Sequence, residues 1–262
     1  SRPPFFCVHP HDGLVTLFYP LVQHLDEERS FYAFQALSPE DLRPTAGGIE
    51  KMAERYVAEI QALYPDGPCL IGGYCFGALI ALAMAKMLSR QGREVPFLAL
   101  IDGYAPGCPE PSSRGSLRGA AFSILDRARR IRPLLEYVSH FSALQKKQYF
   151  LDLIKIQVNE WRVVSEQTGS RRPGYYALPG REKDADWDFC PSSYSGSAVL
   201  FRPTREPLGF RRDRAMGWRR FISGRLEIED ITGYHRSLIF KPHCRLLGAK
   251  LNARLRAIAA DA

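Results

Sequence analysis

One cysteine stands in a sequence context typical of an enzymatic nucleophile. Residues 73–77 read GYCFG, with an apolar run before them and an Ala-rich segment after them. This is the G-x-S-x-G pattern of a nucleophile elbow, with Cys75 in the position that serine usually holds. The tight strand-to-helix turn leaves no room for a side chain two residues on either side of the nucleophile. The N–H groups at the start of the following helix favour an anionic nucleophile there.

A nucleophile of this kind needs a base and an acid that orients the base. Asp102 directly follows the apolar run 96–101, and His235 follows the apolar stretch 226–231 in a predicted turn at 232–235. In a parallel sheet both would lie at the carboxyl ends of strands, on the same edge as Cys75. The order nucleophile, acid, histidine also matches the elbow architecture. We therefore predict Cys75, Asp102 and His235 as a catalytic triad.

Two backbone N–H groups are candidates for stabilising an oxyanion. In the elbow pattern one belongs to the residue after the nucleophile, here Phe76, and the other to the loop after an early strand. That loop is residues 9–13 (HPHDG), and His11 is our candidate donor in it. His9 and His11 could instead chelate a metal, but the sequence offers no third ligand at a suitable spacing. We predict no metal site.

Each candidate has a plainer interpretation. Cys75 could be an inert core residue under a tight turn, because free cysteines are usually buried. Asp102 could cap a helix or a turn, and His235 could be a solvated loop residue. His243 is a rival base, but it falls in the first turn of the last predicted helix, which favours a capping or exposed role.

The elements that must position these residues alternate along the chain. Apolar runs predict strands, and amphipathic or Ala-rich patterns predict helices. The predicted order is strand 5–8, helix 14–25, strand 30–37, helix 49–63, strand 69–72, helix 78–90, strand 96–101, strands 197–201 and 226–231, and helix 242–258. This alternation predicts an α/β fold with a mostly parallel sheet and helices on both faces.

Between the two sheet-forming parts the alternation stops. From 108 to 190 the chain has loop-like ends and helical patterns without strand runs. We therefore predict one α/β core made of residues 1–107 and 191–262. The remaining residues, 108–190, are predicted to be a mostly helical lid insertion.

Composition narrows the class of protein. The chain has 262 residues, 45% apolar and 24% charged, which is a globular balance, and no apolar run approaches the length of a membrane span. Its six cysteines form no CxxC pair, so we expect reduced thiols in a cytoplasmic protein. The first residues contain no Met and no signal-peptide layout, so we expect a piece of a longer protein.

The net charge of +8 comes almost wholly from one segment. Residues 111–172 carry 12 Lys or Arg and 5 Asp or Glu, a net charge of +7. Such a local excess indicates a local anionic partner. A nucleic-acid binder is disfavoured because no binding motif accompanies the charge. The same charges could also form one solvated helix face.

Several of these segments together resemble a known family. Residues 6–10, 72–78, 100–102 and 233–235, with Gly217-Trp218 and the tail to Leu246, are similar to the type I thioesterase domains that end nonribosomal peptide and polyketide synthetases. The resemblance covers nearly the whole chain and is weakest over 108–195, which is a variable lid in the family. It implies an α/β-hydrolase fold. It also implies an enzyme that takes an acyl or peptidyl chain from the phosphopantetheine arm of a carrier domain and releases it.

The resemblance also implies roles and partners. By position, Cys75 is the nucleophile, Asp102 the acid and His235 the base, and Phe76 and His11 supply the oxyanion hole. An upstream peptidyl carrier domain is the expected partner and a peptidyl thioester the expected substrate. No cofactor is expected in this domain, because the phosphopantetheine arrives on the carrier. Neither nucleic acid nor a membrane is expected as a partner, and the excised domain should be a monomer.

The basic lid offers candidate contacts for such a carrier. Carrier domains are usually acidic and their arm bears a phosphate, so a basic lid could steer them. The candidate residues for this contact are Arg127, Arg129, Arg130 and Arg132.

The chain departs from the family at the nucleophile, where most relatives carry serine. A cysteine forms an acyl thioester, a better acyl donor than an oxoester, so the energy of the carrier thioester remains available for the second step. Cysteine variants resemble domains that close strained rings such as β-lactones and β-lactams. We therefore predict release by cyclisation, with β-lactam closure, as in monobactam assembly, as a special case. The alternatives are hydrolysis to a linear acid, an inactive carrier-docking module, and acyl transfer to an external amine.

Overall fold

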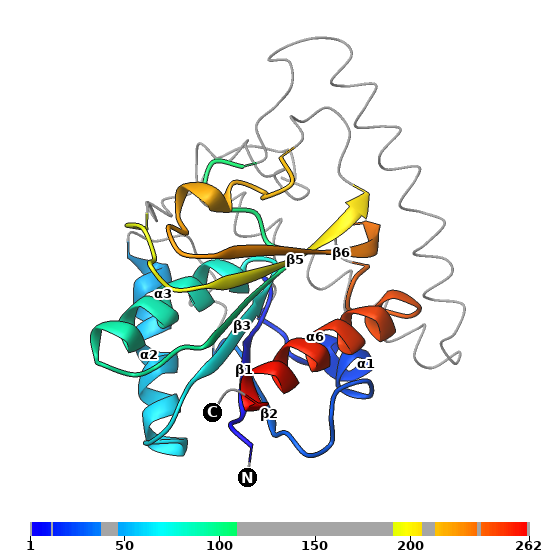
Figure 1. The fold of residues 1–262 in the computed structure, drawn as a ribbon. Helices are drawn as coiled ribbons and strands as arrows, with labels where there is room; N and C mark the ends of the chain where they lie inside the picture. The colour runs from blue at the N-terminus through cyan, green and yellow to red at the C-terminus, as the bar shows by residue number, and fades with distance from the viewer. Residues whose placement is uncertain are drawn as a thin grey trace, which may run out of the picture.

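The structure is a computed structural model that describes residues 2–11, 13–37, 47–108, 191–205, 213–234 and 237–260. These residues form a six-stranded sheet in the order β2-β1-β3-β4-β5-β6 (Figure 1). Its strands are β1 (Phe5–Val8), β2 (Phe31–Phe34), β3 (Leu70–Tyr74), β4 (Phe97–Ile101), β5 (Ala198–Arg205) and β6 (Leu226–Tyr234). Every neighbouring pair runs parallel, so all the carboxyl ends lie along one edge.

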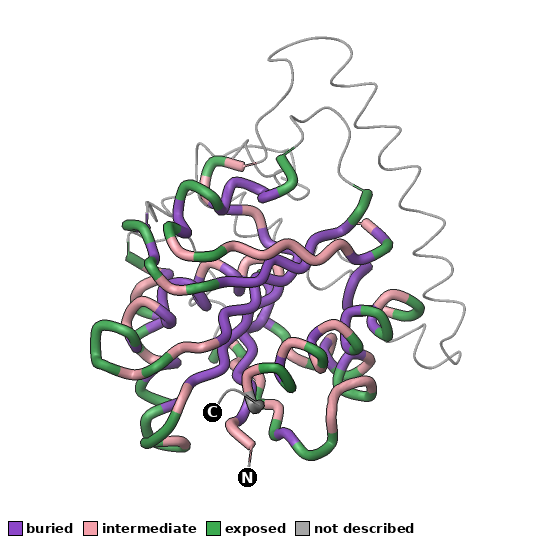
Figure 2. The backbone as a smooth tube through the Cα atoms, in the orientation of Figure 1, coloured by how far each residue is buried: buried purple, intermediate pink, exposed green. Residues whose placement is uncertain are grey.

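Helices cover both faces of this sheet. The described helices are η1 (Thr16–Phe18), α1 (Tyr19–Val22), α2 (Gly48–Leu63), α3 (Gly77–Arg90), η3 (Trp218–Arg220) and α6 (His243–Ala260). α2 and α3 pack on one face with η3, and α1 and α6 pack on the other, which gives two separate apolar cores. The central strands are buried on both sides, and the exposed positions lie mainly on the outer helix faces and in the connecting loops (Figure 2).

The predicted fold class is confirmed, because the sheet is parallel and lies between helices. The predicted lid at 108–190 lies outside the described residues, apart from Cys108. None of the described helices is both long enough and apolar enough to cross a membrane.

Several element ends shift by a few residues, and two segments differ in kind from the sequence prediction. Instead of one helix over 14–25, the chain forms a 3-10 turn and a four-residue α1, with Pro20 near its start. Instead of a turn at 232–235, β6 continues to Tyr234 beside a register shift opposite Pro203 and Arg205. Gly233 has a φ of +134° there, a backbone conformation that glycine adopts without strain. The strand therefore continues through a glycine that the sequence pattern predicts to lie in a turn.

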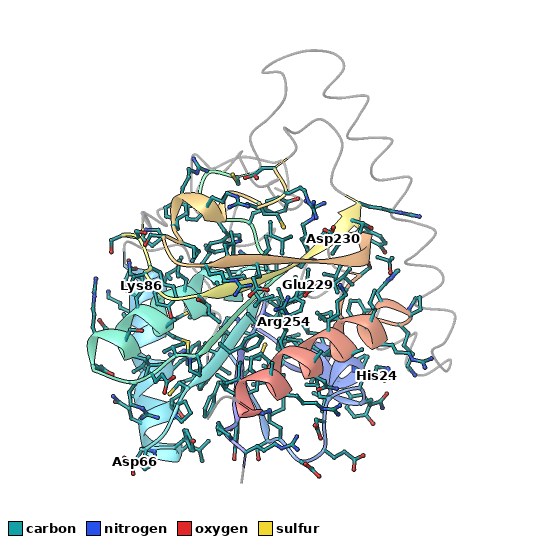
Figure 3. All side chains as sticks on the ribbon, in the orientation of Figure 1. His24, Asp66, Lys86, Glu229, Asp230 and Arg254 are labelled. Atoms are coloured by element: carbon teal, nitrogen blue, oxygen red, sulfur yellow. The ribbon has the colours of Figure 1, made fainter. Side chains whose placement is uncertain are left out.

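A cluster of charged side chains fastens α6 to the edge strand β6. Arg254 donates to Glu229 and, over 2.6 Å, to Glu227, and Lys250 lies 2.7 Å from Glu229 (Figure 3). The Glu229 side chain is 20% exposed and that of Arg254 is 32% exposed. Hydrogen bonds from Lys250 and Arg254 hold the pKa of Glu229 below its usual range, although partial burial opposes them. The helix therefore covers the edge of the sheet through ion pairs as well as apolar contacts.

This cluster predicts an acid-sensitive contribution to stability. A carboxylate with a depressed folded pKa stabilises the fold above its unfolded pKa of about 4.3, and this contribution disappears as pH falls through the folded value. Arg254→Ala should therefore lower the free energy of unfolding by about 1 kcal/mol at pH 7 and by less at pH 3. Urea unfolding of both proteins at the two pH values measures this. Arg245→Ala, at an exposed position of the same helix, is the control. An equal loss at both pH values would contradict the prediction.

Candidate active site

Cys75 occupies the turn between β3 and α3. Its φ is +55°, a left-handed value that is rare for a residue with a side chain, and its side chain is partly exposed. Its backbone N–H donates to Ile101 O over 2.7 Å. A Cβ at Gly73 would lie 2.7 Å from Ala78 N, and one at Gly77 would lie 2.6 Å from Val8 O. Both glycines are therefore required for the close packing of the turn, as the sequence pattern predicts.

Asp102 takes the equivalent place on the neighbouring strand. Tyr74 and Ile101 are partners in the β3–β4 register, so the residues that follow them leave the sheet side by side. Asp102 also has a left-handed φ, +52°, and it is fully buried. Its N–H donates to Phe201 O over 2.8 Å, which ties the turn to β5. The structure thus brings the predicted nucleophile and the predicted acid to one edge of the sheet.

The residue after Asp102 shows how closely the two turns approach. A Cβ at Gly103 would lie 2.6 Å from Cys75 O and 2.5 Å from the Ala78 Cβ. The Gly103 carbonyl accepts a 2.7 Å hydrogen bond from Nε1 of Trp218, which is fully buried in η3. Sequence reasoning gave Trp218 no role. The two residues are 115 positions apart, and only the pair Gly217-Trp218, noted in the family resemblance, pointed to it.

The predicted base lies outside the described residues. Tyr234, the last residue of β6, is described, and His235 follows it directly. The rival base His243 begins α6, and its Nδ1 lies 3.4 Å from Oγ1 of Thr232 on β6. The basic residues Arg127, Arg129, Arg130 and Arg132 also lie outside the described part of the chain.

The two candidate oxyanion donors are neighbours. Phe76 directly precedes α3, and His11 lies in the loop after β1. Their rings meet edge to face, with centroids 5.7 Å apart and an interplanar angle of 68°. The loop after β1 therefore lies against the nucleophile turn, because β1 and β3 are adjacent strands. The two residues predicted to supply oxyanion donors thus come from segments that lie side by side.

His9 is engaged in a different way from a metal ligand. It is fully buried, with Nδ1 2.6 Å from Pro10 O and Nε2 2.8 Å from the Tyr56 hydroxyl of α2. Within the described ranges, no three His, Cys, Asp or Glu side chains gather as metal ligands would. Both ring nitrogens of His9 thus face groups of the protein itself.

Three of the four other described thiols are more buried than Cys75. Cys7, Cys69 and Cys244 are buried, and burial raises the pKa of each thiol. A raised thiol pKa reduces the fraction of reactive thiolate at neutral pH. Cys108 is partly exposed like Cys75, but its sulfur lies 3.2 Å from the Arg220 guanidinium, away from the β3–α3 turn. Cys75 is thus the described thiol that lies at a strand end beside a carboxyl group.

A protein-family model matches most of the chain. A family model described as "Thioesterase domain" matches residues 3–248. The chain is 26% identical over 260 residues to malpinin synthetase of Mortierella alpina, and the match covers 98% of this chain but only 3% of that much longer protein. The chain thus spans a small part of such relatives.

Solved structures with the same fold include a nonribosomal peptide synthetase and a thioesterase domain. A holo four-domain nonribosomal peptide synthetase, AB3403, aligns with a TM-score of 0.62 at 22% identity, over 97% of this chain and 19% of that one. The NocB thioesterase domain, solved as a covalent complex with a fluorophosphonate nocardicin G analog, aligns with a TM-score of 0.61 at 21% identity, over 97% and 95%. At these identities the likeness shows the fold. The family model carries the assignment, and the chain belongs to the thioesterase domain family.

Proposed function

We propose that this domain releases a peptidyl chain from a nonribosomal peptide synthetase by intramolecular cyclisation, with Cys75 as the covalent nucleophile. The observation that carries the proposal is the placement of Cys75, partly exposed in a left-handed turn, beside the fully buried Asp102. In this proposal His235 is the base, and the N–H groups of Phe76 and His11 bind the oxyanion. Malpinin synthetase and AB3403 support a synthetase as the parent protein.

The reaction would proceed in two steps, acylation of Cys75 and then release of the chain. The Cys75 thiolate attacks the carbonyl carbon of the carrier thioester, and the phosphopantetheine thiol leaves with a proton from His235. An amine or hydroxyl group of the bound chain then attacks the acyl-Cys75 thioester. His235 takes its proton, and the Cys75 sulfur leaves as the thiolate. The product is lighter than the linear acid by one water.

The identity of the nucleophile favours cyclisation over hydrolysis. A thioester has less resonance stabilisation than an oxoester, so acyl-Cys75 remains an activated donor after the first step. A weak nitrogen nucleophile or a strained ring benefits from that activation more than attack by water does. A β-lactam is a ring for which this energy would matter, and it is the special case we propose.

The proposed partner is an upstream peptidyl carrier domain that delivers the chain on its phosphopantetheine arm. In this scheme the domain holds no cofactor of its own. Arg127, Arg129, Arg130 and Arg132 are the proposed contacts for the carrier, since their positive charges complement an acidic surface and a phosphate. A cytoplasmic location fits the described cysteines, which form no disulfide with one another.

The first prediction concerns Cys75→Ala. The purified domain is incubated with a peptidyl pantetheine thioester that carries an internal amine, and the products are read by mass spectrometry. We expect a product one water lighter than the linear acid, and we expect Cys75→Ala to lose at least 100-fold in its rate of formation. The matched control is Cys108→Ala, which removes the other partly exposed described thiol and should leave the rate unchanged.

The other outcomes of this experiment distinguish the alternatives. Release of the linear acid alone would show hydrolysis by the same nucleophile. Turnover by Cys75→Ala at the wild-type rate would remove Cys75 from the mechanism. A wild-type protein whose Cys75 is neither acylated nor alkylated by iodoacetamide would be an inactive docking module. Product formed only when an external amine is added would indicate intermolecular acyl transfer.

A second prediction uses the conservative variant Cys75→Ser. Serine keeps a nucleophile in the same turn but stores the chain as an oxoester, a weaker acyl donor. We expect the acyl-enzyme to persist longer in intact-mass spectra. The ratio of cyclised to hydrolysed product should fall tenfold or more, a change of about 1.4 kcal/mol in relative barrier height. An unchanged ratio would show that the energy of the thioester does not decide between the two outcomes.

A further inference from the structure

The buried side chain of His9 makes two hydrogen bonds that together fix its protonation pattern. Nδ1 lies 2.6 Å from Pro10 O, and a carbonyl oxygen can only accept, so Nδ1 carries the proton. In the neutral ring Nε2 then has only a lone pair to offer, and it accepts from the Tyr56 hydroxyl at 2.8 Å. The Pro10 carbonyl thus selects the Nδ1–H form of His9. The Tyr56 hydroxyl on α2, which lies 3.4 Å from Gln35 O and closer to His9, supports this form as the donor to Nε2.

The carbonyl that His9 holds belongs to the peptide unit of a candidate oxyanion donor. Pro10 O also accepts from Gly13 N over 3.0 Å, so two donors fix its direction. In a planar trans peptide the N–H points opposite to the C=O. Because the Pro10 carbonyl faces the His9 ring and Gly13, the N–H of His11 faces the other way.

The loop that carries this N–H is pressed against the nucleophile turn. The Val8 carbonyl lies 2.6 Å from where a Cβ of Gly77 would be, and the His9 carbonyl lies closer still. The His11 ring contacts the Phe76 ring, so the peptide between Pro10 and His11 lies beside the start of α3. A rotation of this peptide unit by half a turn would present a carbonyl oxygen to the oxyanion instead of an N–H.

We infer that His9 is a positioning residue. It holds the Pro10–His11 peptide so that the His11 N–H is ready to bind the oxyanion, and the Tyr56 hydroxyl holds the His9 ring at the opposite nitrogen. This inference rests on the proposed role of His11. A series of contacts therefore links α2 to the proposed oxyanion site. The Tyr56 hydroxyl bonds to the His9 ring, and the ring bonds to the Pro10 carbonyl, which shares a peptide unit with the His11 N–H.

Two amide variants of His9 test the donor directly. In His9→Asn the side-chain N–H₂ takes the place of Nδ1–H and can still donate to Pro10 O. In His9→Gln the amide lies near the place of Nε2, where it reaches Tyr56 but not Pro10 O. The measured quantity is the rate of acylation of Cys75 by a short acyl-pantetheine thioester, followed by intact mass, so that it depends on neither cyclisation nor hydrolysis.

We expect His9→Asn to keep its acylation rate within about tenfold of wild type. His9→Gln should lose about 100-fold, the scale of removing one oxyanion donor, with KM changed less than threefold. Alkylation of Cys75 by iodoacetamide passes through no oxyanion, so its rate should be the same in all three proteins. Equal acylation by the two variants, or an alkylation rate that falls with acylation, would overturn the positioning role.

Tyr56→Phe supplies a readout that needs no turnover. Nitrogen NMR of ¹⁵N-histidine-labelled protein should show His9 protonated at Nδ1 and unprotonated at Nε2 in the wild type, and the Nε2 resonance should shift in Tyr56→Phe because its hydrogen-bond donor is removed. The acylation rate of that variant should fall about fivefold to tenfold. A wild-type ring protonated at Nε2 would overturn the inference whatever the activity. By contrast, an Nδ1–H ring in a protein whose Cys75 alkylates but never acylates would contradict the proposed function.

Discussion

The site depends on how closely three chain segments approach at one edge of the sheet. The parallel register of β1, β3 and β4 brings their carboxyl ends together, and two of the following turns meet at Gly103 and Cys75. The start of α3 also contacts the carbonyls that end β1, through Gly77. A single methyl group at Gly77 or Gly103 would separate the segments that carry the proposed nucleophile, acid and oxyanion donors. The rest of the fold serves to hold this edge: helices on both faces bury the central strands, and ion pairs hold α6 over the last strand.

The proposed acid and the proposed nucleophile at this edge of the sheet differ in their exposure to solvent. Asp102 is fully buried, and a carboxylate out of water is stabilised only by donors or an opposite charge. In such a low-dielectric place an imidazolium partner would interact with it more strongly than in water, which is the role proposed for His235. Cys75 keeps partial exposure, so a thioester on a long flexible arm can approach it. The proposed acid is thus buried, and the proposed nucleophile is partly exposed to solvent.

Local signals in the sequence were sufficient for the elements and for the nucleophile turn. The glycines of GYCFG report a packing requirement within five residues, and the alternation of strands and helices predicts the parallel sheet. The short α1 and the extension of β6 to Tyr234 depend on tertiary context, which no window of sequence contains. Trp218 reaches Gly103 across 115 positions, so only the finished fold shows that it supports the turn after Asp102. The sequence assigned His9 no role beyond a disfavoured metal ligand, and only the fold shows its hydrogen bond to Tyr56 on α2.

The left-handed backbone at Asp102 affects how mutagenesis of this residue would be interpreted. Asp and Asn tolerate a φ of +52°, whereas alanine is held there only at a cost in strain of the order of 1–3 kcal/mol. Alanine scanning at position 102 would therefore combine two losses, the negative charge and the intrinsic preference of the main chain. Asparagine is nearly isosteric and removes the charge alone. The difference between the two variants would separate the electrostatic contribution of the acid from its conformational one.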